Sequence, residues 1–194
     1  MVVVPRSGSI DPEKAISAKL DWISAELERM NAVKAILGDD KVMFGGSYLS
    51  IAFEKSGNEI LIPDFTKGRL VVRATDISRR REMIRRWFIK ESSAYVVRKV
   101  SEFAPIAGAS PSGVDVREIA KWGYCTRTGR LSFSWQLIAL PDRLKEYVVW
   151  HELTHLHVFD HSAAFRKALS KVCPDFKQRE HELDLILPYK LPVS

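Results

Sequence analysis

Two histidines and a glutamate in the last third of the chain have a spacing that suits metal chemistry. His151, Glu152 and His155 form the pattern HExxH in a segment with helical periodicity. Residues four apart in a helix lie one turn apart on one face, so both imidazoles can reach a single Zn²⁺. Glu152 is rotated by about 100° from His151 and can take a proton from a zinc-activated water. We predict one zinc ion here, with Glu152 as the general base.

A catalytic zinc usually has three protein ligands and a fourth position for water. His157 would point to the opposite side of the helix, so it is a poor candidate. His161 lies six residues past the second histidine, and it can share the metal only if the helix ends near residues 158–160. Asp160 or Ser162 can cap a new helix after such a break. We therefore predict that His161 is the third ligand.

The elements around this motif can be read from periodicity. Alternating residues predict a strand over 131–137, in which Leu131 and Phe133 face the core and Ser132 and Ser134 face an accessible surface. Apolar residues at helical spacing predict the remaining elements of the carboxyl-terminal half, which are a helix over 141–156 carrying the motif and two shorter helices over 162–172 and 175–187.

The first half of the chain mixes helices and small strands. The periodicity predicts a strand over 2–4, a helix from Pro12 to about Gly38, antiparallel strands over 42–44, 48–53, 60–62 and 70–72, a helix over 77–104 closed by Pro105, and a strand over 114–119. We expect one domain over residues 1–194, in which 1–75 supply the first helix and the small strands and 76–194 form the catalytic part.

Composition narrows the class of protein. Of the 194 residues, 46% are hydrophobic, which excludes global disorder. Cys125 and Cys173 have no CxxC spacing, and free thiols suit a reducing compartment. No apolar run reaches the roughly 18 residues that a membrane span needs. These features predict a soluble cytoplasmic protein that does not contact membranes.

The formal net charge of +6 raises the question of an acidic partner. The predicted helix over 77–104 carries most of a basic run. This run is either a solvated helix face or a phosphate-binding patch for nucleic acid or a nucleotide, and it consists of Arg79, Arg80, Arg81, Arg85, Arg86 and Lys90.

Three segments resemble the YgjP-like, SprT-like zinc metallopeptidases. They are Lys121-Trp122-Gly123-Tyr124-Cys125 continuing to Trp135, residues 147–156 around the HExxH motif, and Asp160-His161-Ser162 followed by Phe165. The resemblance implies an α+β, zincin-like fold with a small antiparallel or mixed sheet packed on the HExxH helix. It also implies zinc bound by His151, His155 and His161, with Glu152 as the general base.

The resemblance further implies a place for a peptide or protein substrate. The strand over 131–137 would be the edge strand beside the metal, to which an extended peptide adds by β-augmentation, and Ser132 and Ser134 would contact it. Tyr124 stands where the family has a serine, and its phenol could stabilise the developing oxyanion.

Three functions follow from these residues. The leading one is hydrolysis of peptide bonds. The second is hydrolysis of a phosphoanhydride, as in a pyrophosphohydrolase acting on a nucleoside triphosphate such as UTP, although the chain has no P-loop. The third is a role on nucleic acid, either as an associated protease or as a non-enzymatic module with a structural zinc, which would need a fourth protein ligand.

Overall fold

The computed structural model describes Leu20, residues 40–119 and residues 121–186. The chain divides into two compact units, Met1–Gly38 and Asp39–Ser194. The predicted strand over 2–4 and the predicted first helix fall outside the described residues, apart from Leu20. The expectation of a single domain over residues 1–194 therefore stays a prediction, and the fold described below is that of the second unit.

A four-stranded mixed sheet opens this unit. Its strands are β1 (Lys41–Phe44), β2 (Ser47–Lys55), β3 (Ile60–Asp64) and β4 (Arg69–Ala74), in the order β1-β2-β4-β3. The outer pairs are antiparallel as predicted, but β2 and β4 are parallel. β4, whose Leu70 and Val72 are fully buried, lies between β2 and β3. This leaves β3, whose Pro63 cannot donate to a ladder, at the edge.

One long helix, α2 (Ile77–Ala107), follows the sheet. Asp76 caps its start by accepting a hydrogen bond from the backbone N–H of Arg79 at 2.9 Å. The prediction that Pro105 closes this helix is wrong by one turn. Pro105 lies inside the last turn, and the helix ends at Ala107. Gly108 caps it, with a φ of 62° in the left-handed conformation that glycine adopts readily.

The second sheet has three strands, β5 (Gly113–Arg117), β6 (Gly123–Cys125) and β7 (Arg130–Ser134), in the order β5-β7-β6. The central strand is thus β7, and the prediction of an edge strand over 131–137 is wrong. β7 also ends at Ser134, because that hydroxyl accepts from the backbone N–H of Gln136 at 3.2 Å. A short 3-10 helix, η2 (Trp135–Ala139), begins there.

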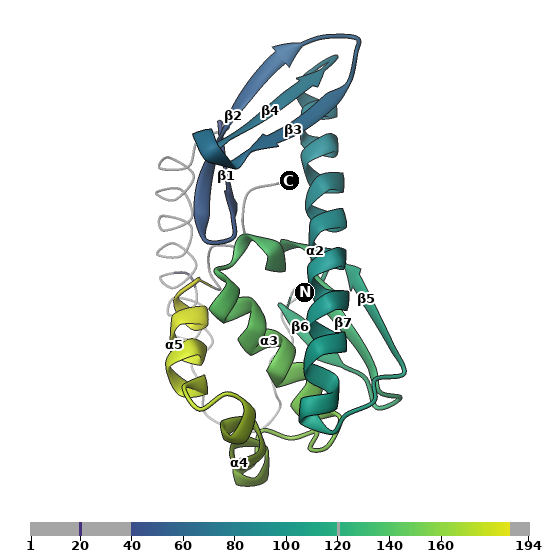
Figure 1. Ribbon diagram of the computed structural model, residues 1–194, viewed down its shortest axis with the longest axis vertical. Helices are drawn as coiled ribbons and strands as arrows, with labels where there is room; N and C mark the ends of the chain where they lie inside the picture. The colour runs from purple at the N-terminus through teal and green to yellow at the C-terminus, as the bar shows by residue number, and fades with distance from the viewer. Residues whose placement is uncertain (1–19, 21–39, 120, 187–194) are drawn as a thin grey trace. The chain divides into compact units, whose positions relative to one another are not determined.

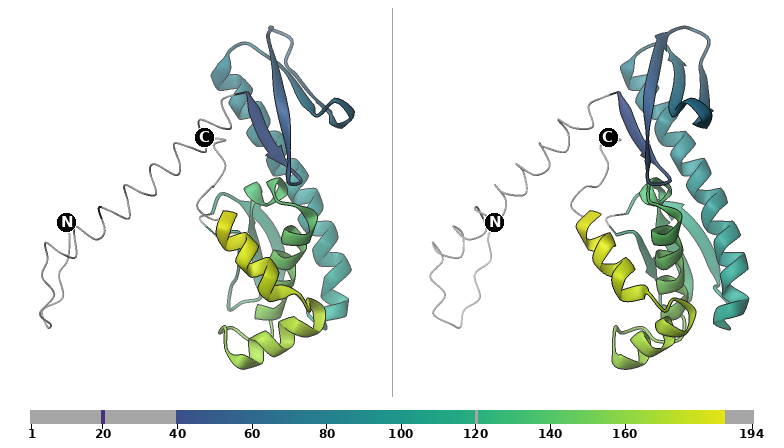
Figure 2. Two further views of the ribbon diagram at one scale, coloured as in Figure 1. Left: turned by 90° about the vertical axis from the view of Figure 1, so that its left-hand side faces the viewer. Right: turned by 60° about the vertical axis from the view of Figure 1, so that its left-hand side comes forward.

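Three helices complete the unit. They are α3 (Asp142–His155), α4 (Ala163–Val172) and α5 (Phe176–Ile186). Figures 1 and 2 show α3 between α2 and α5, and α3 also contacts β6. This arrangement confirms the predicted α+β fold, in which the HExxH helix packs beside a small sheet.

No helix among the described residues is both long enough and apolar enough to cross a membrane.

Aromatic rings join the first sheet to the helices. Phe88 of α2 is fully buried, and its ring centroid lies 6.0 Å from that of Phe44 in β1 and 6.0 Å from that of Trp135 in η2. Both contacts are edge-to-face, the geometry that aromatic quadrupoles favour. Through η2, this cluster supports the segment that leads into the HExxH helix.

We expect Phe88→Ala to lower the free energy of unfolding by about 3–5 kcal/mol, because the substitution opens a cavity in a closed core. Ile106→Ala on the same helix is a control, since that side chain is 66% exposed and its loss should cost about 0.5 kcal/mol or less. Urea denaturation followed by circular dichroism measures both. Equal losses for the two variants would contradict the aromatic cluster's role.

Candidate metal centre

The chain turns sharply after the HExxH helix. α3 ends at His155, where the backbone N–H groups of His157 and Val158 both bond to the carbonyl of Thr154 at 3.0 and 3.1 Å. Ser162 then caps α4, and its backbone N–H donates to Asp160 at 3.2 Å. Asp160 therefore stabilises the turn, and the predicted helix break is confirmed.

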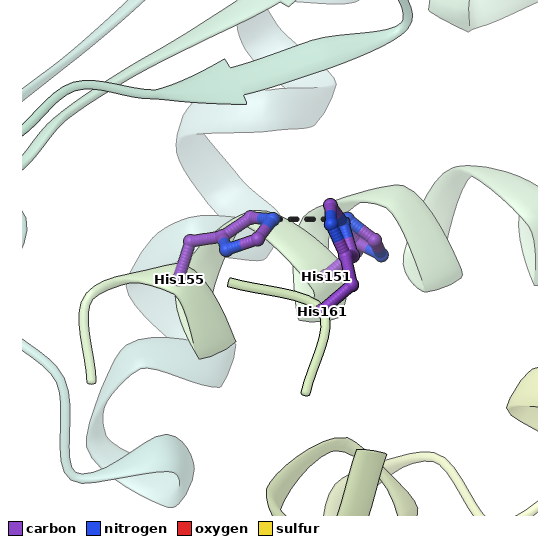
Figure 3. A group of neighbouring side chains, drawn as sticks. All are labelled: His151, His155 and His161. Carbon is purple, nitrogen blue, oxygen red and sulfur yellow. Dashed lines mark hydrogen bonds between the residues drawn. The ribbon is translucent and has the colours of Figure 1, made fainter. Parts of the chain in front are cut away.

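This turn brings three imidazoles together. Nε2 of His151 lies 3.1 Å from Nε2 of His155 and 3.0 Å from Nε2 of His161. Figure 3 shows the ring of His155 pointing toward the other two, and one nitrogen from each ring lies within 4.8 Å of those of the other two. Two nitrogens about 2.0–2.1 Å from one tetrahedral zinc are separated by about 3.3–3.4 Å. The two pairs that involve His151 are thus close to this separation, and the nitrogens of His155 and His161 lie within 4.8 Å of each other.

Packing and a backbone contact orient these rings. The ring of Phe165 is buried beneath them, with centroids 4.9 Å from His151, 4.6 Å from His155 and 5.0 Å from His161. Nδ1 of His155 lies 3.0 Å from the carbonyl oxygen of Val158. Donation from Nδ1–H to that carbonyl leaves the lone pair of Nε2 free for a metal.

The electrostatics keep two imidazoles neutral. Burial, followed by repulsion from His155 and His161, lowers the pKa of His151 to about 3. Burial also lowers the pKa of His155, although its bond to Val158 opposes the shift. Neutral imidazoles carry the free lone pairs that a metal ligand needs.

Glu152 is buried beside this cluster with an unsatisfied oxygen. The residue is 5% exposed, and its Oε2 has no hydrogen-bond partner among the described residues. Burial raises the pKa of Glu152 to about 8, against a weaker opposing effect of Lys121. A buried carboxylate without a partner is costly, so this atom fits a site that a cation and its water complete.

The edge strand β6 closes one side of the site. A Cβ added to Gly123 would lie 2.9 Å from both Cγ and Oε1 of Glu152, so only a residue without a side chain lets β6 approach α3 so closely. A cleft of about 370 Å³ opens along this strand. Its lining joins β6 to the metal cluster and includes Lys121, Cys125, Phe159 and the three histidines.

Two of the three predicted substrate residues are buried in the fold. Ser132 and Ser134 are 0% and 1% exposed, because β7 is the central strand and both of its faces are covered. Tyr124 borders the cleft, but Gly123 faces Glu152 and successive residues of a strand point to opposite faces. The side chain of Tyr124 therefore projects from the face of β6 opposite Glu152. Tyr124 contributes to the raised pKa of Arg117, after the larger effect of Asp115.

The basic run of α2 is largely paired within the fold. Arg79 bonds to Glu59 and Glu82, Arg85 to Glu118, and Arg86 to Glu82. Arg80 is buried, with its guanidinium over the ring of Phe53 at 5.5 Å. The other two histidines lie outside the metal cluster. His157 bonds to the carbonyl of Ala107 at 3.0 Å, and His181 is exposed on α5.

Comparison with known proteins identifies the class. The sequence matches the model of the YgjP-like metallopeptidase domain over residues 1–185. The chain belongs to this family. The predicted family is thus confirmed, and it makes the chain a member of a class of metal-dependent hydrolases. His151, His155 and His161 are the group among the described residues that could hold the ion.

One solved structure is also similar, the crystal structure of the metallopeptidase zymogen of Pyrococcus abyssi abylysin. It has 22% sequence identity and a TM-score of 0.42, and the match covers 45% of this chain and 90% of that one. That similarity is too low to carry an argument about the site. No curated protein matches the sequence significantly.

The contact between Gly123 and Glu152 predicts a catalytic defect. Gly123→Ala should displace the carboxylate and reduce the family's peptidase activity at least tenfold, while metal binding by the histidines persists. Gly57→Ala is the control, because a Cβ there meets nothing within 4 Å. Peptidase assays with metal analysis measure both variants, and full activity of Gly123→Ala would refute the steric argument.

The raised pKa of Glu152 predicts a pH-dependent stability difference in the metal-free protein. Its unfolded pKa is near 4.5 and its folded pKa about 8, so the carboxyl destabilises the fold increasingly as pH rises between these values. Glu152→Gln should therefore match the wild type below pH 4.5 and exceed its stability by roughly 2–5 kcal/mol above pH 8. Urea denaturation in a chelator tests this. A difference that does not change with pH would contradict it.

Proposed function

We propose that the protein is a zinc-dependent metallopeptidase that hydrolyses peptide bonds with one Zn²⁺ held by His151, His155 and His161. The observation that carries this proposal is the convergence of three Nε2 atoms, two of their pairs separated by 3.0 and 3.1 Å, beside the unpartnered buried carboxylate of Glu152. Family membership supports the general class, and the histidine cluster supports the metal and its ligands.

The donor set suits zinc. Imidazole nitrogens are ligands that Zn²⁺ prefers, and catalytic sites keep one position open beyond three protein ligands. Among the described residues, the cluster of possible ligands contains three histidines and no fourth group, and a cleft of about 370 Å³ adjoins it. When bound, the ion supplies the Lewis acidity that polarises a carbonyl and lowers the pKa of water toward about 7.

Glu152 supplies the proton transfer. Its Oε2 faces no protein donor among the described residues, so it can accept the proton of the attacking water. It then passes this proton to the nitrogen of the leaving amine, which breaks the carbon–nitrogen bond. The positive charge of an ion at the histidines would favour the charged carboxylate over the protonated form, which burial otherwise favours.

Among the described strands β6 lies at the edge of its sheet, and this edge supports a peptide as the substrate. The backbone N–H of Ser134 bonds to the carbonyl of Trp122, and the N–H of Thr126 bonds to the carbonyl of Arg130, both at 2.9 Å. In this antiparallel ladder alternate residues bond to β7, so the N–H and carbonyl groups of Gly123 and Cys125 point away from it. An extended peptide could pair with these groups beside the metal, at β6 and not at the predicted strand over 131–137.

The alternatives receive less support. The basic run that would hold the phosphates of a nucleotide or nucleic acid is mostly engaged with acidic residues. A structural zinc would need a fourth ligand, which the cluster of described residues does not contain. The two free cysteines are consistent with the cytoplasmic location we propose.

Glu152→Gln tests the proposed chemistry. We expect the variant to keep one bound zinc and to lose peptide hydrolysis by about 10²–10⁴-fold, the usual contribution of a general base. Zinc content is measured by atomic absorption, and turnover is measured with denatured casein and with UTP in parallel. Retained casein cleavage would refute the role of Glu152, and hydrolysis of UTP without casein cleavage would refute the substrate class.

A further inference from the structure

A second cavity adjoins the metal cleft on the side of α5. It has a volume of about 250 Å³, and it shares Lys121, Gly123, His151 and Glu152 with the metal cleft. These shared residues include the edge of β6 and the proposed general base. A substrate held along β6 would therefore place a side chain next to the scissile bond in this cavity.

The inner walls of the cavity are largely apolar. Trp122, Val148 and Leu183 line it, and all three are buried. Tyr147 adds an aromatic ring, and its hydroxyl lies 3.4 Å from Nδ1 of His151. Such walls suit the methylene chain of a long side chain, which gains from leaving water.

Two carboxylates stand on the α5 wall. Glu180 and Asp184 line the cavity and are four residues apart, so they share one helix face. Among the described residues neither has an ion-pair partner, whereas Glu182 pairs with Arg143 and Asp175 pairs with Arg179. Glu182, the other acidic residue of α5, is thus paired, and the two that line the cavity are not.

The charge of these two carboxylates affects the pKa of another residue that lines the cavity, Tyr147. Burial is the main cause of the raised pKa of Tyr147, and Glu180 and Asp184 are the next two. Lys121 is the basic residue that lines the cavity, and it is exposed. The carboxylates therefore give the α5 wall of the cavity a negative charge.

A buried donor in the cavity wall also has no partner. Trp122 is 5% exposed, and its indole N–H has no acceptor among the described residues. An unsatisfied buried donor is unfavourable. Because Trp122 lines the cavity, a shift of its ring toward a bound peptide would let a carbonyl of that peptide satisfy the N–H. This observation is independent of the acidic pair, and it indicates a ligand that carries a hydrogen-bond acceptor.

We infer that this cavity is a specificity pocket for a basic side chain, arginine or lysine, of a substrate residue that flanks the scissile bond. The methylene chain contacts Trp122, Val148 and Leu183, and the cationic end lies near Glu180 and Asp184. The inference rests on the proposed peptidase function and names its substrate class.

The test compares peptides that differ at one residue flanking the scissile bond, which is arginine, lysine, uncharged norleucine or glutamate. The zinc-loaded wild type should cleave the arginine and lysine peptides with kcat/KM about three- to tenfold above that of the norleucine peptide, and the preference should shrink in 0.5 M salt. Cleavage without any preference for the basic residues would overturn the pocket and leave the peptidase function standing.

Substitutions on α5 make the test specific. Glu180→Gln combined with Asp184→Asn should abolish the preference, and Glu180→Lys combined with Asp184→Lys should turn it toward the glutamate peptide. Glu182→Gln is the matched control, because it removes one negative charge from the same helix at a carboxylate that pairs with Arg143. The preference should persist in this control. Loss of it there, or its survival in the double variants, would overturn the assignment.

A binding measurement tests the specificity pocket independently of peptide hydrolysis. Calorimetry with the zinc-loaded Glu152→Gln protein should show tighter binding of the lysine peptide than of the norleucine peptide. If the wild type cleaves no peptide but this difference remains, the proposed function fails and the pocket stands. Equal binding of the two peptides would contradict the pocket.

Discussion

Nε2 of His151 lies 3.1 Å from Nε2 of His155 and 3.0 Å from Nε2 of His161, and the nitrogens of His155 and His161 lie within 4.8 Å of each other. Protonating these rings would place like charges next to one another in a buried site. The low pKa of His151, which burial causes first, expresses this cost. A divalent cation relieves it, because one ion accepts all three lone pairs. The rest of the site is arranged around this requirement.

The scaffold holds the repelling groups in place. Phe165 packs under all three rings and thereby restrains them from turning apart. On the other side, β6 approaches so closely that a Cβ at position 123 would clash with the side chain of Glu152. The aromatic cluster around Phe88 supports η2, which leads into α3. Packing energy from the core thus stabilises a site that is unfavourable by itself.

The sequence predicted those parts of the site that depend on local geometry. The spacing of His151 and His155 is a property of one helix, and the break before His161 follows from the capping residue Ser162. The sequence did not predict the order of the strands. A three-residue strand such as β6 is too short to show alternation, and the period of residues 131–137 cannot distinguish an edge strand from a central one covered on both faces.

The parallel pairing of β2 with β4 escaped prediction for the same reason, since it depends on a long-range choice of neighbours. The cavity on α5 could not be foreseen either. Glu180 and Asp184 look like any exposed acidic pair in the sequence, and only the fold places them with Trp122 and Glu152 in the lining of one cavity. Residue patterns within one helix or strand therefore predicted local structure reliably. The pairing of strands and the packing of helices could be known only from the structure.

X-ray absorption spectroscopy of the zinc-loaded protein tests the central claim most directly. We predict one zinc per chain with three imidazole nitrogens and one oxygen at about 2.0–2.1 Å, and one imidazole fewer in His161→Ala. A site closed by four protein ligands, or a spectrum unchanged in that variant, would contradict the account.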